Sequence, residues 1–160
     1  MTAQRINDAD LRRILSAAKT IACVGASANP LRPSYFVARY LSMKGYRVLP
    51  INPAYVGQSL FGEAFHATLN DVAGERVDMV DIFRRSDQVE AIVDQALTEL
   101  RPTLKSVWMQ FGVINETAAS KARSAGLDVV MDRCPKLEHQ RLFGDLRKAG
   151  FNTGIISSKL

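Results

Sequence analysis

Cysteine is scarce in this chain, and long apolar runs are missing. Only Cys23 and Cys134 occur among the 160 residues, and they are not in a C-x-x-C arrangement. This excludes a disulfide framework, so both thiols are expected to be reduced, and the sequence predicts no metal site. No stretch approaches the roughly 18 apolar residues of a membrane span, and the N-terminus has no long apolar run. We therefore expect a cytoplasmic protein that makes no membrane contact.

The composition gives no sign of disorder or of several domains. Hydrophobic residues make up 47% of the chain and charged residues 23%, which is typical of a globular protein. A chain of 160 residues can bury a substantial core, so we expect one domain over residues 1–160.

Positive charge is in excess, with a formal net charge of +5 at pH 7, which favours an anionic partner. The basic residues are scattered, and the chain has neither an aromatic-rich RNA-binding strand nor zinc finger spacing. Nucleic acid is therefore disfavoured as a partner. A polyphosphate small molecule is the better expectation.

The dinucleotide-binding pattern G-x-G-x-x-G is also missing. After Gly25, the positions of the second and third glycines hold Ser27 and Pro30, which disfavours an ordinary nicotinamide site. What remains is a short apolar strand over 21–24, a glycine turn and the start of a helix. Such a helix start offers unpaired N–H groups and the positive end of a dipole, which suit a phosphate. With Arg32 beside it the stretch predicts an anion site, and a turn that binds nothing is the alternative.

Apolar strand patterns alternate with helical stripes along the rest of the chain. Strands are expected at 21–24, 46–51, 77–83, 105–110 and 127–131. Helix caps are expected at Asn7 or Asp8, Gly45, Ser86, Asn115 and Gly126. Residues 53–68 are expected to form a loop, and the stretch from Gly150 is not assigned. The alternation predicts an α/β, Rossmann-like doubly wound sheet of about five mainly parallel strands with helices on both faces.

In such a sheet the carboxyl ends of the strands meet at one edge, which we call the rim. The predicted strands bring to the rim Ser27, Asn52, Arg84, Gln110 and Cys134. Asn52 stands where dinucleotide-binding folds have an acid for the ribose, so an adenosine would be held differently; a turn residue before proline is the alternative. Arg84 and Arg85 lie between a strand end and a helix start, where such sheets bind ligands, although solvated arginines are the commoner case.

Several segments in combination resemble a known family. They are 24–27, Pro30 with 32–35, 48–53, 81–84, 107–112 and 131–136. Their order and spacing resemble the small stand-alone CoA-binding domain proteins, which are similar to the amino-terminal domain of the succinyl-CoA synthetase alpha subunit. The resemblance covers about residues 8–143.

The resemblance implies a Rossmann-like domain that binds coenzyme A or an acyl-CoA across the rim. It implies roles in the phosphate turn and first helix for Gly25, Ala26, Ser27, Arg32 and Ser34, and a place near the adenosine for Asn52. Arg84, Arg85 and Ser86 would border the next loop, and Trp108, Gln110 and Gly112 would flank the pantetheine arm. The polyanionic ligand agrees with the helix start and the arginines inferred from the residues alone.

The sequence does not indicate a set of catalytic residues. For His66 and His139 a surface or packing role is favoured over chemistry. Cys134 is the one thiol candidate, because the neighbouring Arg133 and Lys136 are cations that would favour its thiolate. We therefore favour a non-catalytic binding or regulatory module. One alternative is a thiol-disulfide or acyl-transfer enzyme that uses Cys134. Another is the nucleotide-binding half of a larger complex. A second copy of the chain or another protein is a possible partner.

Overall fold

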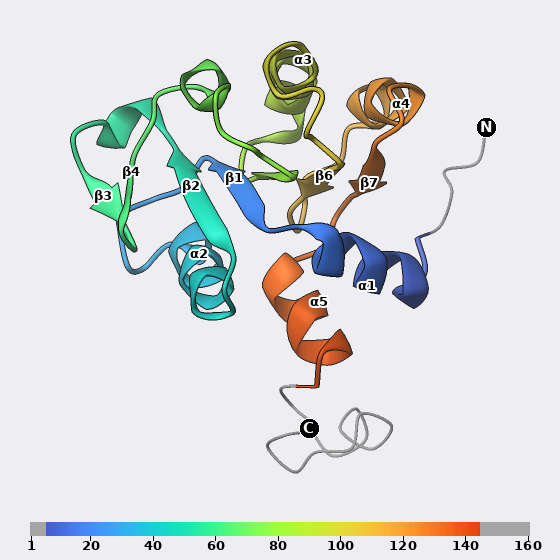
Figure 1. The fold of residues 1–160 in the computed structure, drawn as a ribbon, viewed down its shortest axis with the longest axis horizontal. Coiled ribbons are helices and arrows are strands. Elements are labelled where there is room, and N and C mark those ends of the chain that lie inside the picture. Colours follow the sequence, from blue (N-terminus) through green and yellow to red (C-terminus); the bar gives the residue numbers. More distant parts are fainter. Residues whose placement is uncertain (1–5, 145–160) are drawn as a thin grey trace.

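The computed structural model describes residues 6–144, and its centre is a parallel five-stranded sheet with the strand order β2-β1-β5-β6-β7 (Figure 1). Helices cover both faces of the sheet, so the predicted fold class is confirmed. α3 and α4 lie on one face, and α1, α2 and α5 lie on the other. The stretch from Gly150, left unassigned above, lies outside the described residues.

The sheet strands are β1 (Thr20–Val24), β2 (Arg47–Ile51), β5 (Met79–Ile82), β6 (Ser106–Met109) and β7 (Asp128–Val130). The helices are α1 (Asp8–Ala17), α2 (Pro33–Met43), α3 (Val89–Glu99), α4 (Glu116–Ser124) and α5 (Pro135–Leu142). Shorter elements are the 3₁₀ turns η1 (Pro53–Tyr55), η2 (Leu69–Val72) and η3 (Ser86–Gln88), and the strands β3 (Ser59–Leu60) and β4 (Glu63–Ala64). Among the described residues no helix is long and apolar enough to cross a membrane.

The strands are buried on both faces, as their short apolar runs predict. Successive side chains alternate between two cores, which places Val24, Ile82 and Met109 under α3 and α4. The opposite core, under α1, α2 and α5, contains Cys23 and Trp108. Apolar burial on both sides makes the sheet a firm support for the loops at its rim.

Helix ends follow the predicted caps in all but one case. The Asn7 side chain accepts a hydrogen bond from the Asp10 N–H at the start of α1, and Asn115 does the same for α4 through the Ala118 N–H. Ser86 was predicted as a helix cap and this is wrong, because α3 begins only at Val89, after η3.

The region predicted as a loop over 53–68 contains a small hairpin, β3–β4, that the sequence pattern did not reveal. Its two-residue turn consists of Phe61 and Gly62, both with positive φ (48° and 86°). The chain then runs along the outer edge of β2, where the His66 N–H donates to the Pro50 carbonyl and the Asn52 N–H donates to the His66 carbonyl. The free edge of β2 is thereby covered at its carboxyl end.

Candidate functional site

The turn after β1 lies directly against the end of β5. Gly25 has φ +89°, and a Cβ atom on it would lie 2.4 Å from the Phe83 carbonyl oxygen and 3.3 Å from Arg84 Nε. No other residue type fits this backbone or this space without a shift. The predicted glycine turn and the predicted arginine therefore meet at the rim.

Two serines hold the shape of this turn. The Ser27 N–H donates to Ser34 Oγ (3.0 Å), and the Asn29 N–H donates to Ser27 Oγ (3.0 Å). Ser27 Oγ also hydrogen-bonds the Tyr55 hydroxyl at 3.1 Å, which ties the turn to the loop after β2. Both serines are buried. Their side chains preorganise the turn, and in this state they do not project into solvent toward a ligand.

Asn52, predicted to lie near an adenosine, also holds the shape of the turn. Its Nδ2 donates to the Ala26 carbonyl at 2.9 Å, and its Oδ1 accepts from the Ala54 N–H at 3.0 Å. The Asn52 side chain therefore clamps the ends of β1 and β2 together, and an acidic residue in its place could not donate to a carbonyl.

Arg32 and Arg84 supply positive charge on either side of the turn. Arg32 is the exposed N-cap residue of α2, whose first N–H groups lack intrahelical partners, and Arg84 is partly buried. Neither arginine forms an ion pair with another described residue. Arg85 differs, because it is exposed and lies 3.5 Å from Asp87. The structure thus brings the Arg84 side chain to the turn and the Arg32 backbone to its far end, whereas Arg85 forms an exposed ion pair.

A pocket of about 340 Å³ opens beside Arg84, near the lower limit for ligand pockets. It lies between the ends of β1 and β2, the loop 67–69 and α3. Its lining includes Ile51, Thr68, Arg84, Gln88, Ile92 and Gln95. The lining combines apolar surface with amide and hydroxyl groups, which suits a flat heteroaromatic ring that also forms hydrogen bonds.

The loops after β5, β6 and β7 are joined by hydrogen bonds. Ser86 Oγ accepts from the Ile114 N–H (3.0 Å) and donates to the Gly112 carbonyl (3.3 Å). The Gly112 N–H donates to Asp132 Oδ1 at 2.7 Å. Ser86 and Gly112, both predicted site residues, therefore fix the shape of this half of the rim.

Trp108 and Gln110 were both predicted to flank the pantetheine arm, but they occupy different environments. Trp108 is fully buried, and its Nε1 donates to the Arg133 carbonyl at 2.8 Å, so it supports the rim from the core and is not exposed at it. Gln110 keeps 6% of its surface exposed. Its Nε2 donates to Asp81, at 2.9 Å from Oδ1 and 3.1 Å from Oδ2. Burial raises the pKa of Asp81 to about 7.

Cys134 does not have the environment of a reactive thiol. It is 6% exposed, and burial raises its pKa, with a smaller opposing effect from hydrogen bonds donated by the Leu137 and Lys136 N–H groups. Lys136 does lower the pKa of Cys134, as expected, but the cost of desolvation is larger, so the pKa is raised overall and the thiolate is not favoured. Arg133 instead lies 3.4 Å from Glu138. The described residues contain no group of acidic, histidine and cysteine side chains that could hold a metal ion.

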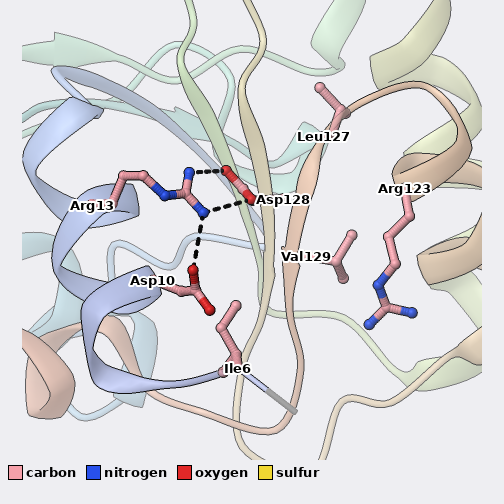
Figure 2. Close-up of a pocket in the computed structure, with 7 residues that line it drawn as sticks. All are labelled: Ile6, Asp10, Arg13, Arg123, Leu127, Asp128 and Val129. Atoms are coloured by element: carbon pink, nitrogen blue, oxygen red, sulfur yellow. Dashed lines mark hydrogen bonds and ion pairs between the residues drawn. The ribbon is translucent and has the colours of Figure 1, made fainter. Parts of the chain in front are cut away.

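A second hollow, of about 150 Å³, lies at the amino ends of the strands between α1 and α4 (Figure 2). Figure 2 shows the Arg13 guanidinium reaching Asp128 with two contacts, of 2.7 and 3.0 Å, and Asp10 with a third, of 3.4 Å. The charge of Arg13 is thus already neutralised. Open α/β sheets bind ligands at the opposite edge, so the rim is the better candidate site.

Some residues of the site were not predicted from the sequence. Tyr55, Asp81 and Asp132 fix the turn, the Gln110 side chain and the Gly112 loop respectively. Asp81 could have been found, because a carboxyl group inside an otherwise apolar strand needs a partner. The contacts of Tyr55 and Asp132 depend on loop conformations that carry no periodic signal.

Comparison with known proteins identifies the family of this chain. Residues 19–140 match the model of the CoA binding domain family. The chain is 33% identical over 136 residues to the uncharacterized protein YneT of Bacillus subtilis, covering 85% of this chain and 96% of YneT. It is 44% identical to cell-free ID.343 from Thermus thermophilus, whose structure superposes with a TM-score of 0.79 over 86% of this chain and 99% of that one. A dinucleotide-forming acetyl-coenzyme A synthetase 1 of Ca. Korarchaeum cryptofilum is 26% identical, with a TM-score of 0.60 over 75% of this chain and 27% of the synthetase chain. This chain belongs to the CoA-binding domain family.

Proposed function

We propose that this protein binds coenzyme A or an acyl-CoA across the rim, as a non-catalytic binding or regulatory module. The observation that carries the proposal is the position of Arg84. Its guanidinium lies beside the Gly25 turn and also lines the pocket below α3. A cation that has no ion-pair partner among the described residues thereby lies between the proposed phosphate site and the proposed pocket for a ring.

The parts of the ligand suit the parts of the rim. The adenine would occupy the pocket between the loop 67–69 and α3, where Gln88 and Gln95 offer hydrogen bonds. The phosphates would lie over the Gly25 turn between Arg32 and Arg84, at the start of α2. The pantetheine arm would then continue over the ends of β5 and β6, past Gln110 and Gly112.

A binding role is favoured over catalysis by the chemistry of the rim. Cys134 is buried with a raised pKa, so its thiol stays protonated at neutral pH and is a poor nucleophile. The serines and amides at the rim hold loops together, and Arg32 and Arg84 offer positive charge. These groups bind and orient, and among the described residues none of them pairs a nucleophile with an adjacent base.

Thermal shift with coenzyme A, dephospho-CoA, NAD and ATP tests the proposal. We expect the largest increase in Tm with coenzyme A, and a loss of about tenfold or more in affinity for Arg84→Gln, since a charge-assisted hydrogen bond contributes about 1.5–3 kcal/mol. Arg123→Gln, which removes the same charge at the opposite edge of the sheet, is the matched control. Equal responses to all four compounds would reduce the site to a general anion site and overturn the proposal.

Intact mass after incubation with CoA disulfide separates binding from thiol chemistry. We expect no adduct, because Cys134 is buried and protonated. An adduct that disappears in Cys134→Ser would instead support the enzyme alternative.

A further inference from the structure

Asp81 and Gln110 form a buried polar pair directly below the rim. Asp81 is completely buried, and Gln110 exposes only 6% of its surface. Both side chains lie on the α2 and α5 side of the sheet, in the layer of Cys23 and Trp108. Among the described residues no cation pairs with Asp81, so the Gln110 amide is the side chain that satisfies its carboxyl group.

This contact determines which end of the Gln110 amide faces outward. Its Nε2 donates to Asp81, and its Oε1 forms no hydrogen bond with any described residue. Every fully buried side-chain nitrogen or oxygen in the described chain has a hydrogen-bond partner, so Oε1 keeps some exposed surface, and Gln110 directly follows β6 at the rim. The reverse orientation would point Oε1 at a carboxylate, which has no proton to donate.

We propose that Asp81 is a positioning residue that turns Gln110 Oε1 toward the rim, where this oxygen accepts a hydrogen bond from an amide N–H of the pantetheine arm. The inference rests on the proposed function, because it assigns one contact within the same site.

The orientation of Gln110 also sets the direction of the ligand. Phosphate oxygens are acceptors at neutral pH and repel an amide oxygen, whereas the pantetheine arm carries two amide N–H donors. Cations stand at the β1 end of the rim, at Arg32 and Arg84, and an acceptor stands at the β6 end. The phosphates therefore lie over β1 and the amides over β6.

Protonation of Asp81 weakens this arrangement. A protonated carboxyl group can donate to Oε1, so both orientations of the Gln110 amide become acceptable. The other titratable groups that face Asp81 are Cys23 from β1 and Cys134 at the start of α5, beside the cation Lys136. Burial raises the pKa of both thiols, so they stay neutral. Of these groups Asp81 is the one that changes charge between pH 6 and 8, since its pKa is about 7.

Calorimetric titration with coenzyme A and with its fragment 3′-phospho-ADP, which lacks the pantetheine arm, tests the proposal. At one fixed pH the ratio of the two affinities isolates the arm. The terminal phosphate of the fragment ionises near neutral pH and is esterified in coenzyme A, so the effect of pH is taken as the difference between the wild type and Asp81→Asn. We expect Asp81→Asn to lower this ratio about two- to tenfold at pH 8 while the fragment binds as before. Gln110→Met should have the same effect, and lowering the pH from 8 to 6 should reduce the wild-type ratio relative to the ratio of Asp81→Asn. Asp128→Asn, at the opposite edge, is the control.

An unchanged ratio in Asp81→Asn, or an equal loss for both ligands, would overturn the assignment. Failure of the wild type to bind either ligand would instead overturn the proposed function, and the pantetheine contact with it. NMR of the free protein tests the positioning without any ligand. The Gln110 side-chain amide signals should titrate near pH 7 in the wild type and not in Asp81→Asn, and signals that do not titrate would show that Asp81 does not orient Gln110.

Discussion

At the scale of single residues, Asp81 places a carboxyl group inside the sheet, and its side-chain partner among the described residues is the Gln110 amide and no cation. Burial raises its pKa from 3.8 to about 7, so the folded protein binds this proton more tightly than the unfolded chain does. The free energy of unfolding should therefore decrease as the pH rises from about 4 to about 7, and change no further through this group above that range.

Asp81→Asn should remove this dependence. The pKa difference of about three units corresponds to at most roughly 4 kcal/mol, so the unfolding free energy of the variant should be flatter between pH 4 and 7 by up to that amount. Urea denaturation at several pH values measures this, with Asp128→Asn as the surface control. Parallel curves for the wild type and Asp81→Asn would contradict the prediction.

At the scale of elements, the rim loops after β5 and β6 are held by Asn115. Its Oδ1 caps α4, and its Nδ2 donates to the Ser86 carbonyl at 2.9 Å. Asn115→Ala should lower the unfolding free energy by about 1–2 kcal/mol, because it removes a cap and a hydrogen bond between loops. Thermal denaturation measures the change, and the exposed Asn70→Ala should differ from the wild type by less than about 0.5 kcal/mol. Equal effects of the two substitutions would contradict this role.

Some of these elements could be predicted from the sequence and others could not. The five sheet strands were predictable because buried parallel strands read as apolar runs, and the approach of Arg84 to the Gly25 turn followed from the parallel order. β3 and β4 were missed because each has only two residues, and Phe61 stands where hairpin turns of this kind usually have Asn or Gly. Ser86 was misassigned because its hydroxyl bonds a neighbouring loop, a contact that no local pattern encodes.

At the scale of the whole molecule, the net charge of +5 should attract an anionic ligand over distances that salt shortens. We expect the Kd for coenzyme A to rise roughly three- to tenfold between 50 and 500 mM NaCl, with a smaller rise for dephospho-CoA, which lacks one phosphate. Calorimetric titration across this range measures both. A Kd that is independent of salt would mean that the arginines at the rim do not contact phosphate.

The covered edge of β2 restricts how copies of this protein can associate. The outward-facing carbonyl of Pro50 is already bonded by the His66 N–H, and proline has no N–H to offer on that side. At Pro50 an incoming strand would find neither donor nor acceptor, so strand addition is blocked at this end of the β2 border. At the other border β7 has only three residues, Asp128–Val130, which is too short a template for fibre-like growth. Edge-to-edge pairing of sheets between copies is therefore disfavoured at the rim end of β2 and at the short β7.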